Sequence, residues 1–428
     1  MEVYILVISF IILLGIGVPI AWCIGLSSIF TMLVSIPMLS ALTTVAQRMG
    51  TGLDSFSLLA IPFFVLAGSI MNRGGIAKRL VNFAKTLVGS LPGGLAHVNI
   101  IASMLFGAIS GSAVAAVSAI GGMLGDSMEE EGYSKEFSAA VNITSSTTGL
   151  VIPPSNILIV YSLASGGVSI AALFVAGYIP GILTGLFLMI VSTVLAKKNN
   201  YPVGKRSTLR EVGKTFFDAL PSLFLLFVVI GGIVAGWFTA TEASAVAVLY
   251  CLILTAVYRE ISVKELPDII LASVGTTAIV MLLISTSMSM SWIMAYENIP
   301  QNITEALLSV SDNKFVLFFL INMILLFVGV FMDMTPAVLI FTPIFLPIVT
   351  KLGMDPTHFG IVMVMNLCIG LCTPPVGSVL FVGVGVAGTT IEKVIKPLLP
   401  LFIAMLVALM LVTYVPALSL WLPSLFGL

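Results

Sequence analysis

The chain has 428 residues, of which 59% are hydrophobic and 9% are charged, and its formal net charge is −1. Soluble domains carry about 25% charged residues, so this composition excludes a soluble enzyme. It also argues against nucleic-acid binding, because no basic domain stands apart from the apolar runs. The 38 glycines and 21 prolines spread through those runs predict an all-α polytopic membrane protein whose helices pack closely and break often.

The first residues form an apolar segment. Met1 to Trp22 has neither a basic start nor a small-residue cleavage site, so we interpret it as a retained span and not as a signal peptide. The wider run from Val3 to Ile36 fits one kinked helix or two passes around Pro19. Counting all apolar runs, we expect roughly eleven spans plus two re-entrant hairpins.

Two amphipathic stretches interrupt the apolar runs. Residues 77–91 place three basic side chains against apolar ones, and a similar stretch covers residues 299–314. Such stretches are typical of helices that lie along a membrane surface. Basic residues gather around 73–85 and again around 197–214, which predicts that these connections face the cytoplasm.

A short motif occurs twice inside apolar runs, as Gly149 to Pro154 and as Gly370 to Pro375, and the two copies lie 221 residues apart. A proline pair removes two backbone donors and clashes with carbonyls four residues earlier. The carbonyls predicted to lose their helical partners are those of Gly149, Leu150, Gly370 and Leu371. Broken helices at matching positions of two halves indicate a secondary transporter with its sites near the bilayer midplane.

Small and polar residues interrupt an apolar stretch before each motif. The first stretch, about 98–125, contains Ser112, and adding 221 to 112 gives Asp333 in the second stretch, about 315–350. Such residues in the middle of an apolar run suit the tip of a re-entrant hairpin. We therefore expect two inverted-topology repeats, each with a re-entrant helical hairpin and a broken helix.

The expected domain plan has five parts. They are N-terminal scaffold helices with an interfacial arm helix (1–92), a first repeat with its break at 149–155 (93–196), central scaffold helices with a second arm helix (197–314), a second repeat with its break at 370–377 (315–396), and a C-terminal helix (397–428).

Oxygen atoms gather around the two breaks. Besides the freed carbonyls they belong to the hydroxyls of Ser110, Ser112, Thr148 and Thr373 and to the Asp333 carboxylate. These hard ligands suit Na⁺ better than a transition metal. The first break has no ionisable residue nearby, which argues against a proton relay. The second halves of the broken helices begin near Ser155 and Gly377, where unpaired amide donors favour a carboxylate.

Structural explanations exist for the same residues. Ser155 and Asp333 are each also expected as helix caps, and the Ser/Thr cluster before the first break also suits packing between helices. Glu242 is expected as a first-turn acid behind a threonine cap. Cys368 and Cys372 lie one turn apart, but both histidines are distant in sequence, so we interpret the cysteines as packing residues and not as a metal site.

Several longer motifs are similar to those of one family. They are Leu91-Pro92-Gly93-Gly94-Leu95-Ala96-His97-Val98-Asn99, Phe106-Gly107-Ala108-Ile109-Ser110-Gly111-Ser112, Ile152-Pro153-Pro154-Ser155, Phe238-Thr239-Ala240-Thr241-Glu242-Ala243 and Thr373-Pro374-Pro375-Val376-Gly377. Together they resemble the large membrane subunit of tripartite ATP-independent periplasmic (TRAP) transporters, and the resemblance covers nearly the whole chain.

The resemblance implies a Na⁺-driven importer of organic acids in the bacterial inner membrane. It implies an elevator-type fold, in which hairpins and broken helices form a transport domain that moves against a scaffold domain. It also implies a small membrane subunit, absent from this unfused chain, and a soluble periplasmic substrate-binding protein. Membrane lipids are expected partners, and nucleic acid is not.

The resemblance also implies sites for two or more Na⁺ ions. The first set of ligands is Ser110, Ser112, Thr148, Gly149 and Val151, and the second is Asp333, Thr335, Gly370 and Thr373. We assign substrate binding to residues around the hairpin tips and breaks, namely Ser110, Ser112, Asn142, Ser155, Asn156, Thr335, Asn366 and Gly377.

The substrate and some rival functions stay open. The chain looks closest to the sialic-acid branch, although members for C4-dicarboxylates share these motifs. The glycine-rich segment 120–125 lacks a proline often found there in the family. Rival interpretations are a carboxylate symporter without a binding protein, an ion channel, and an intramembrane enzyme, for which a nucleophile with a base or a metal constellation would be needed.

Overall fold

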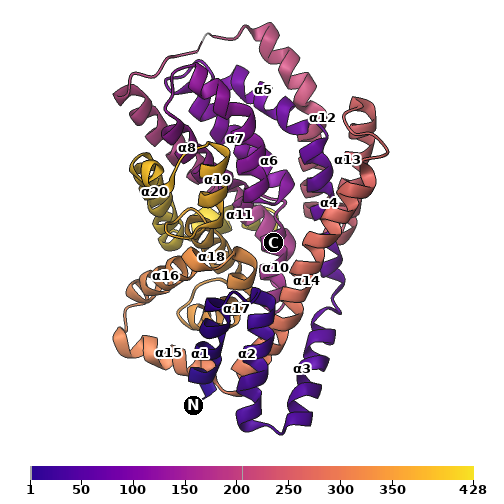
Figure 1. The fold of residues 1–428 in the computed structure, drawn as a ribbon, viewed down its shortest axis with the longest axis vertical. Coiled ribbons are helices and arrows are strands. Elements are labelled where there is room, and N and C mark those ends of the chain that lie inside the picture. The colour runs from indigo at the N-terminus through magenta and orange to yellow at the C-terminus, as the bar shows by residue number, and fades with distance from the viewer. Residues whose placement is uncertain (1, 205) are drawn as a thin grey trace.

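The structure is a computed structural model that describes residues 2–204 and 206–428, and these residues form helices joined by loops (Figure 1). Met1 and Lys205, which the sequence predictions include in the first span and in a basic cluster, lie outside the described residues.

Eight helices of the described chain are long and apolar enough to cross a membrane, or nine if one bent pair is a single span. The eight are Phe56–Arg73 (the short helix η1, Phe56–Leu59, continued by α4, Ala60–Arg73), α11 (Ile170–Lys198), α12 (Leu209–Val234), α13 (Ala240–Tyr258), α14 (Leu266–Tyr296), α16 (Lys314–Phe331), α17 (Met334–Lys351) and α20 (Ile391–Tyr414). The expectation of eleven spans beside two hairpins was too high, because several apolar runs are divided into shorter helices.

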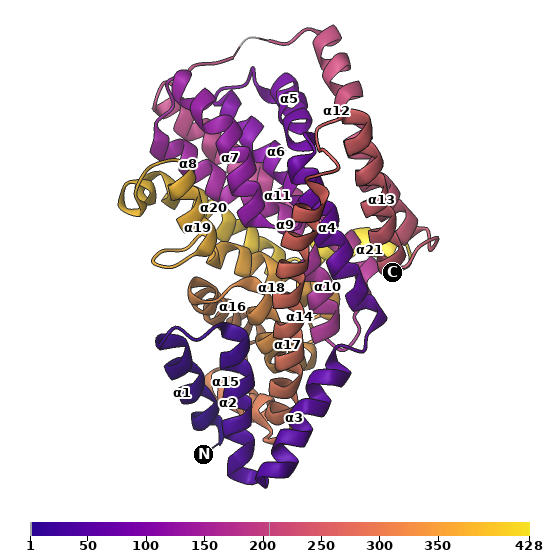
Figure 2. The ribbon, with the colours of Figure 1, turned by 45° about the vertical axis from the view of Figure 1, so that its right-hand side comes forward.

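The N-terminal region shows such a division. The chain forms α1 (Glu2–Gly15) and α2 (Ile20–Ser35), which lie side by side, followed by α3 (Met38–Gly52) (Figure 2). Gly17 adopts a φ of +85° and Pro19 precedes α2, so one continuous helix cannot form. The prediction of one span over Met1 to Trp22 was therefore wrong, and two helices around Pro19 are present.

Both amphipathic stretches are helices. The first is α5 (Ile76–Val88), which buries Leu80 and Ala84 and packs on α12 and on the first helix after it in the chain, α6 (Gly94–Ser110). Its Arg79 guanidinium lies 3.6 Å from the Tyr258 ring and 3.7 Å from a Glu260 oxygen. The second, α15 (Ile299–Val310), packs on α14 and α17. Apolar periodicity thus located both helices correctly.

Two runs of helices follow the same order of lengths. The first is α6, α7 (Ala113–Glu130), α8 (Lys135–Ser146) with α9 (Thr148–Val151), α10 (Asn156–Ala164) and α11; the second is α16, α17, α18 (Pro356–Gly370), α19 (Ser378–Val386) and α20. Corresponding helices begin 220 to 222 residues apart. The spacing of the two proline pairs therefore extends to every element around them.

Close glycine contacts join each hairpin to its broken helix. A Cβ on Gly107 of α6 would lie 2.8 Å from the Gly149 Cα, and a Cβ on Gly370 of α18 would lie 2.6 Å from the Gly329 Cα of α16. Between the two broken helices, the Cys368 thiol donates to the Thr147 carbonyl at 3.3 Å, and these two residues are 221 positions apart. Equivalent positions of the two runs thus meet at the centre of the molecule. The cysteines are buried there, in agreement with a packing role.

The glycine contacts lead to a stability prediction. Gly370→Ala is expected to destabilise the protein by about 1–3 kcal/mol, because the added methyl group must displace backbone atoms of the facing helix. Thermal melting of the purified protein measures the effect. Gly275→Ala is the control, since that exposed position on α14 has open space for a Cβ. Equal melting temperatures for the two variants would contradict the close contact.

The remaining helices surround these two runs. Figure 1 shows α12, α13 and α14 beside α4, and the C-terminal α21 (Ala417–Leu425) packs on α11 and α18. The start of α13 is a capping box, in which Thr239 Oγ1 accepts from the Glu242 amide at 3.2 Å and a Glu242 oxygen accepts from the Thr239 amide at 2.8 Å. The prediction that Glu242 is a first-turn acid behind a threonine cap is confirmed.

Candidate functional site

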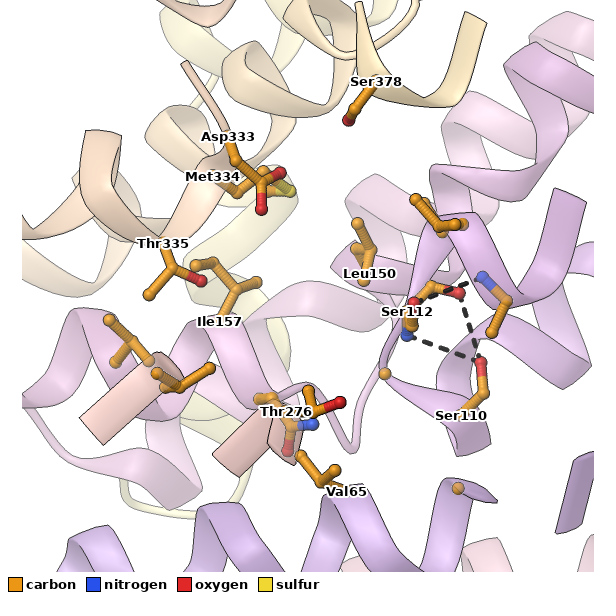
Figure 3. A pocket seen from close by; sticks show the side chains of 18 of the residues that line it. Val65, Ser110, Ser112, Leu150, Ile157, Thr276, Asp333, Met334, Thr335 and Ser378 are labelled. Atoms are coloured by element: carbon orange, nitrogen blue, oxygen red, sulfur yellow. Dashed lines mark hydrogen bonds between the residues drawn. The ribbon is translucent and has the colours of Figure 1, made fainter. Parts of the chain in front are cut away.

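A cavity of about 340 Å³ lies between the tips of both hairpins, α10, α19 and the helices α4 and α14 (Figure 3). The first hairpin, α6 and α7, contributes Ser110 and Ser112, and the second, α16 and α17, contributes Asp333 and Thr335. The two tips therefore face one space, although they are 221 residues apart in sequence.

Four helices begin at this cavity. The residues at or next to their first positions that line it are Ala113 of α7, Asn156 of α10, Met334 of α17 and Ser378 of α19. The first amide groups of a helix have no partner within it and carry positive partial charge, so such ends attract anions. Among the described residues that line the cavity none is Lys, Arg or His, and Asp333 is the one ionisable side chain. The positive potential there comes from backbone amides.

The first hairpin tip is ordered by its own serines. Ser112 is the N-cap of α7 and accepts from the Ala115 amide at 3.2 Å, while Ser110 Oγ and the Ser112 backbone are 3.4 Å apart (Figure 3). Gly111 between them has a φ of +62°, and a Cβ there would lie 2.8 Å from Asn156 Nδ2. The turn therefore needs glycine for its backbone angle and to let α10 approach.

The second hairpin tip presents a carboxylate. Asp333 occupies the N-cap position of α17, yet its side chain forms no capping hydrogen bond there and is exposed at the cavity. The capping explanation therefore holds for the position of the backbone and not for the side chain. Figure 3 shows the Asp333 carboxylate directed into the space that Thr335 also lines. A carboxylate in this position suits a cation, as hard oxygen ligands do.

Most carbonyls at the two breaks are hydrogen-bonded. The Leu150 carbonyl accepts from Ser155 Oγ at 2.5 Å, the Gly370 carbonyl from the Thr373 amide at 2.9 Å, and the Leu371 carbonyl from the Leu380 amide at 3.3 Å. The prediction that these three carbonyls lose all partners was wrong, because residues after each proline pair fold back onto them. Each carbonyl oxygen has two lone pairs, so it still has capacity for a second ligand.

The other proposed Na⁺ ligands lie behind the cavity lining. Thr148 and Val151 line a separate void of about 10 Å³, and Thr148 Oγ1 donates to the Ser145 carbonyl at 2.6 Å. Thr373 Oγ1 donates to the Ile369 carbonyl at 2.8 Å. Gly149 and Gly370 are at the helix crossings described above. Of the two ligand sets, the cavity therefore brings together Ser110, Ser112, Asp333 and Thr335.

The proposed substrate residues divide in the same way. Ser110, Ser112, Asn156 and Thr335 line the cavity, whereas Ser155 and Gly377 directly precede the helices that begin there. Asn366 lies elsewhere, and its side-chain amide donates to the Asn322 carbonyl at 2.9 Å and to the Asn322 Oδ1 at 2.8 Å. Asn142 lies along a different cavity.

Sequence reasoning missed the side of the cavity formed by α4 and α14. Ser69 and Asn72 of α4 and Thr276 of α14 line it (Figure 3 labels Thr276). These polar residues lie within apolar helices, which is the one sequence signal that marked them. A Cβ on Gly68 of α4 would lie 2.7 Å from the Ser110 carbonyl, so α4 touches the first hairpin tip.

Residues 7–418 match the family model described as "Tripartite ATP-independent periplasmic transporter, DctM component". The chain belongs to this family. Membership makes it a transporter subunit and not an enzyme, and places it in the bacterial inner membrane as a multi-pass protein. It implies a small membrane subunit and a periplasmic binding protein as partners.

Three relatives illustrate the range of this DctM family. Uncharacterized protein YgiK of Salmonella typhimurium is 59% identical, over 98% of this chain and 96% of its own length. The isethionate TRAP transporter permease protein DctMQ of Oleidesulfovibrio alaskensis is 43% identical, over 96% of this chain and 65% of its own length. The sialic acid TRAP transporter large permease protein SiaM of Vibrio cholerae is 40% identical, over 97% and 96%. Other relatives are named for C4-dicarboxylates.

A solved structure shares the fold. The crystal structure of the Alcanivorax borkumensis YdaH transporter matches with a TM-score of 0.66 over 90% of this chain and 89% of that one, at 13% sequence identity. The arrangement of helices is thus that of a known transporter fold.

Proposed function

We propose that this DctM-family chain is the large subunit of a Na⁺-coupled importer of an organic acid. The observation that carries the proposal is the cavity at which four helices begin and which no basic side chain lines in the described chain. Such a cavity favours an anion held by backbone amides, as is common at helix N-termini. A small carboxylate or sulfonate fits this chemistry.

The same cavity gives a physical reason for coupling to a cation. Asp333 and an anionic substrate in one space repel each other, and the cavity supplies no cationic side chain from the described residues to offset that repulsion. A Na⁺ ion beside Asp333 would remove the penalty, so each ligand would strengthen binding of the other. We propose two Na⁺ sites. The first uses Ser110, Ser112, Thr148, Gly149 and Val151, and the second uses Asp333, Thr335, Gly370 and Thr373.

We further propose inverted repeats and an elevator movement. The matching helix order and the contact between Thr147 and Cys368 support a pseudo-twofold relation between the two runs. The hairpins and broken helices would form the transport domain, and α4 and α14 would belong to the scaffold. The close approach of Gly68 to Ser110 would then lie at the moving interface.

Sialic acid is the first substrate to test, on the basis of the sequence resemblance. C4-dicarboxylates are the second candidate, and isethionate is a third because one relative is named for it. The names of the relatives do not select among them. A carboxylate symporter without a binding protein and an ion channel are the rival functions.

Uptake into proteoliposomes tests this proposal. The vesicles would contain this chain and its small subunit, with or without the binding protein and an inward Na⁺ gradient, and each labelled acid would be supplied in turn. Uptake of one acid that needs all components is the expected result. Uptake without the binding protein would favour a simple symporter, and non-saturating conductance would favour a channel.

Ser112→Ala is expected to weaken Na⁺ dependence. The change removes a hydroxyl from the first proposed Na⁺ site and the cap of α7, so it should also cost about 1 kcal/mol of helix stability. The Na⁺ concentration for half-maximal uptake should rise. Ser134→Ala, which removes a comparable cap from α8, is the matched control. If both variants transport normally at limiting Na⁺, the first site is wrongly assigned.

A further inference from the structure

A second polar cavity of about 380 Å³ lies between α7, α8 and the end of α19. Glycines of α7 provide its room. A Cβ on Gly121 would collide with the Asn142 amide, and Gly122 and Gly125 have no neighbouring atom within 4 Å of a Cβ position. The glycine-rich segment of α7 therefore leaves open space beside α8.

Buried polar atoms without partners line this cavity. The side chains of Asn99, Ser138 and Asn142 are 0%, 6% and 4% exposed. Asn99 Nδ2, Ser138 Oγ and Asn142 Oδ1 have no hydrogen-bond partner among the described residues. Buried polar atoms are nearly always paired, so three such atoms along one cavity indicate an occupant.

Neighbouring hydrogen bonds fix which atom each amide presents. Asn142 Nδ2 donates to the Val117 carbonyl at 2.7 Å, so its Oδ1 is the free atom. Asn99 Oδ1 accepts from Ser145 Oγ at 2.9 Å, so its Nδ2 is free. The cavity thus offers an acceptor from Asn142, a hydroxyl from Ser138 and one amide donor.

The charge around the cavity is negative. Asp126 and Glu129 line it, and Lys135, 3.2 Å from a Glu129 oxygen, offsets one of these carboxylates. Asp126 forms no ion pair with any described residue. The C-terminal end of α19, which carries negative partial charge, closes the same cavity. One net carboxylate and a helix C-terminus together attract a cation.

We propose that this cavity binds a monovalent inorganic cation. Neutral oxygens from Ser138 and Asn142 with one uncompensated carboxylate suit Na⁺ or K⁺, whereas divalent ions are usually bound by more carboxylates. The Asn99 amide donates to a water molecule on the ion. Ser112 and Asp126 are 14 positions apart on α7, which corresponds to about 21 Å, so this site is separate from the candidate functional site.

Thermal melting of the purified chain with its small subunit, in lipid nanodiscs, tests the proposal. NaCl, KCl and choline chloride are titrated in an Asp333→Asn background, which weakens the second proposed Na⁺ site. Asp126→Asn and Ser138→Ala are then added separately, and Asp218→Asn, at an exposed aspartate of α12, is the matched control.

The expected result is a rise in melting temperature with NaCl or KCl but not with choline chloride. Its half-saturating concentration should increase about tenfold with Asp126→Asn or Ser138→Ala and stay unchanged with Asp218→Asn. Unchanged cation dependence in the Asp126→Asn protein, or none in the Asp333→Asn background, would overturn the proposal and leave a water-filled cavity. Because the assay measures no transport, its outcome is independent of the proposed import activity.

Discussion

Asp333→Asn is expected to raise the Na⁺ concentration for half-maximal uptake at least tenfold, which is about 1.4 kcal/mol of lost Na⁺ binding. The substitution keeps the size of the side chain and removes the one charge among the described residues of the cavity. Since the Asp333 side chain makes no capping hydrogen bond, the fold should be little affected. Uptake measured across a Na⁺ series, together with thermal melting, separates the two effects.

Asp355 offers a matched control. It is also an N-cap aspartate, but its carboxylate accepts from the Thr357 amide at 2.8 Å and the His358 amide at 3.2 Å, and it does not line the cavity. Asp355→Ala should therefore lower stability by about 1 kcal/mol and leave the Na⁺ dependence of uptake unchanged. A shift in Na⁺ dependence with Asp355→Ala and not with Asp333→Asn would remove Asp333 from the proposed site.

Ser378→Asp is expected to reduce uptake of the organic acid at least tenfold, a loss of about 1.4 kcal/mol or more in substrate binding. Ser378 is the first residue of α19 and lines the cavity. An added carboxylate there would occupy the amide donors proposed for the substrate and repel a second anion. An acid in the first turn also favours a helix, so the melting temperature should not fall.

Two neutral variants complete this test. Ser378→Asn has nearly the size of the aspartate without its charge, and Ser378→Ala removes the hydroxyl alone. Both are expected to retain most of the uptake, because the backbone amides remain. If Ser378→Asn is as inactive as Ser378→Asp, steric exclusion and not charge explains the loss, and the argument for an anion site at α19 fails.

The breaks and hairpin tips were predictable from sequence because proline, glycine and an intramembrane carboxylate each have a strong physical consequence. The two proline pairs placed the ends of α9 and α18, and their spacing linked Ser112 to Asp333 at one cavity. What the pattern did not give is how the backbone after each pair folds back. The bond from Ser155 Oγ to the Leu150 carbonyl depends on that local geometry.

The roles of buried polar residues were not predictable from the sequence. Helix α8 is buried on all sides, so no periodicity shows which way Asn142 points, and it lies along the second cavity. Asn366 pairs with Asn322 of α16, and only the tertiary packing brings the two together. The contributions of α4 and α14 to the candidate site lie outside the repeat, so the spacing argument did not extend to Asn72 or Thr276.

Substrate-driven entry of radiolabelled Na⁺ tests the central claim, coupling between an anion and Na⁺ in one cavity, most directly. Proteoliposomes with this chain and its small subunit would receive loaded binding protein outside, at equal Na⁺ concentrations on both sides. We predict that the transported acid drives Na⁺ inward and that Asp333→Asn abolishes this flux. Uptake of the acid without Na⁺ entry would contradict the account.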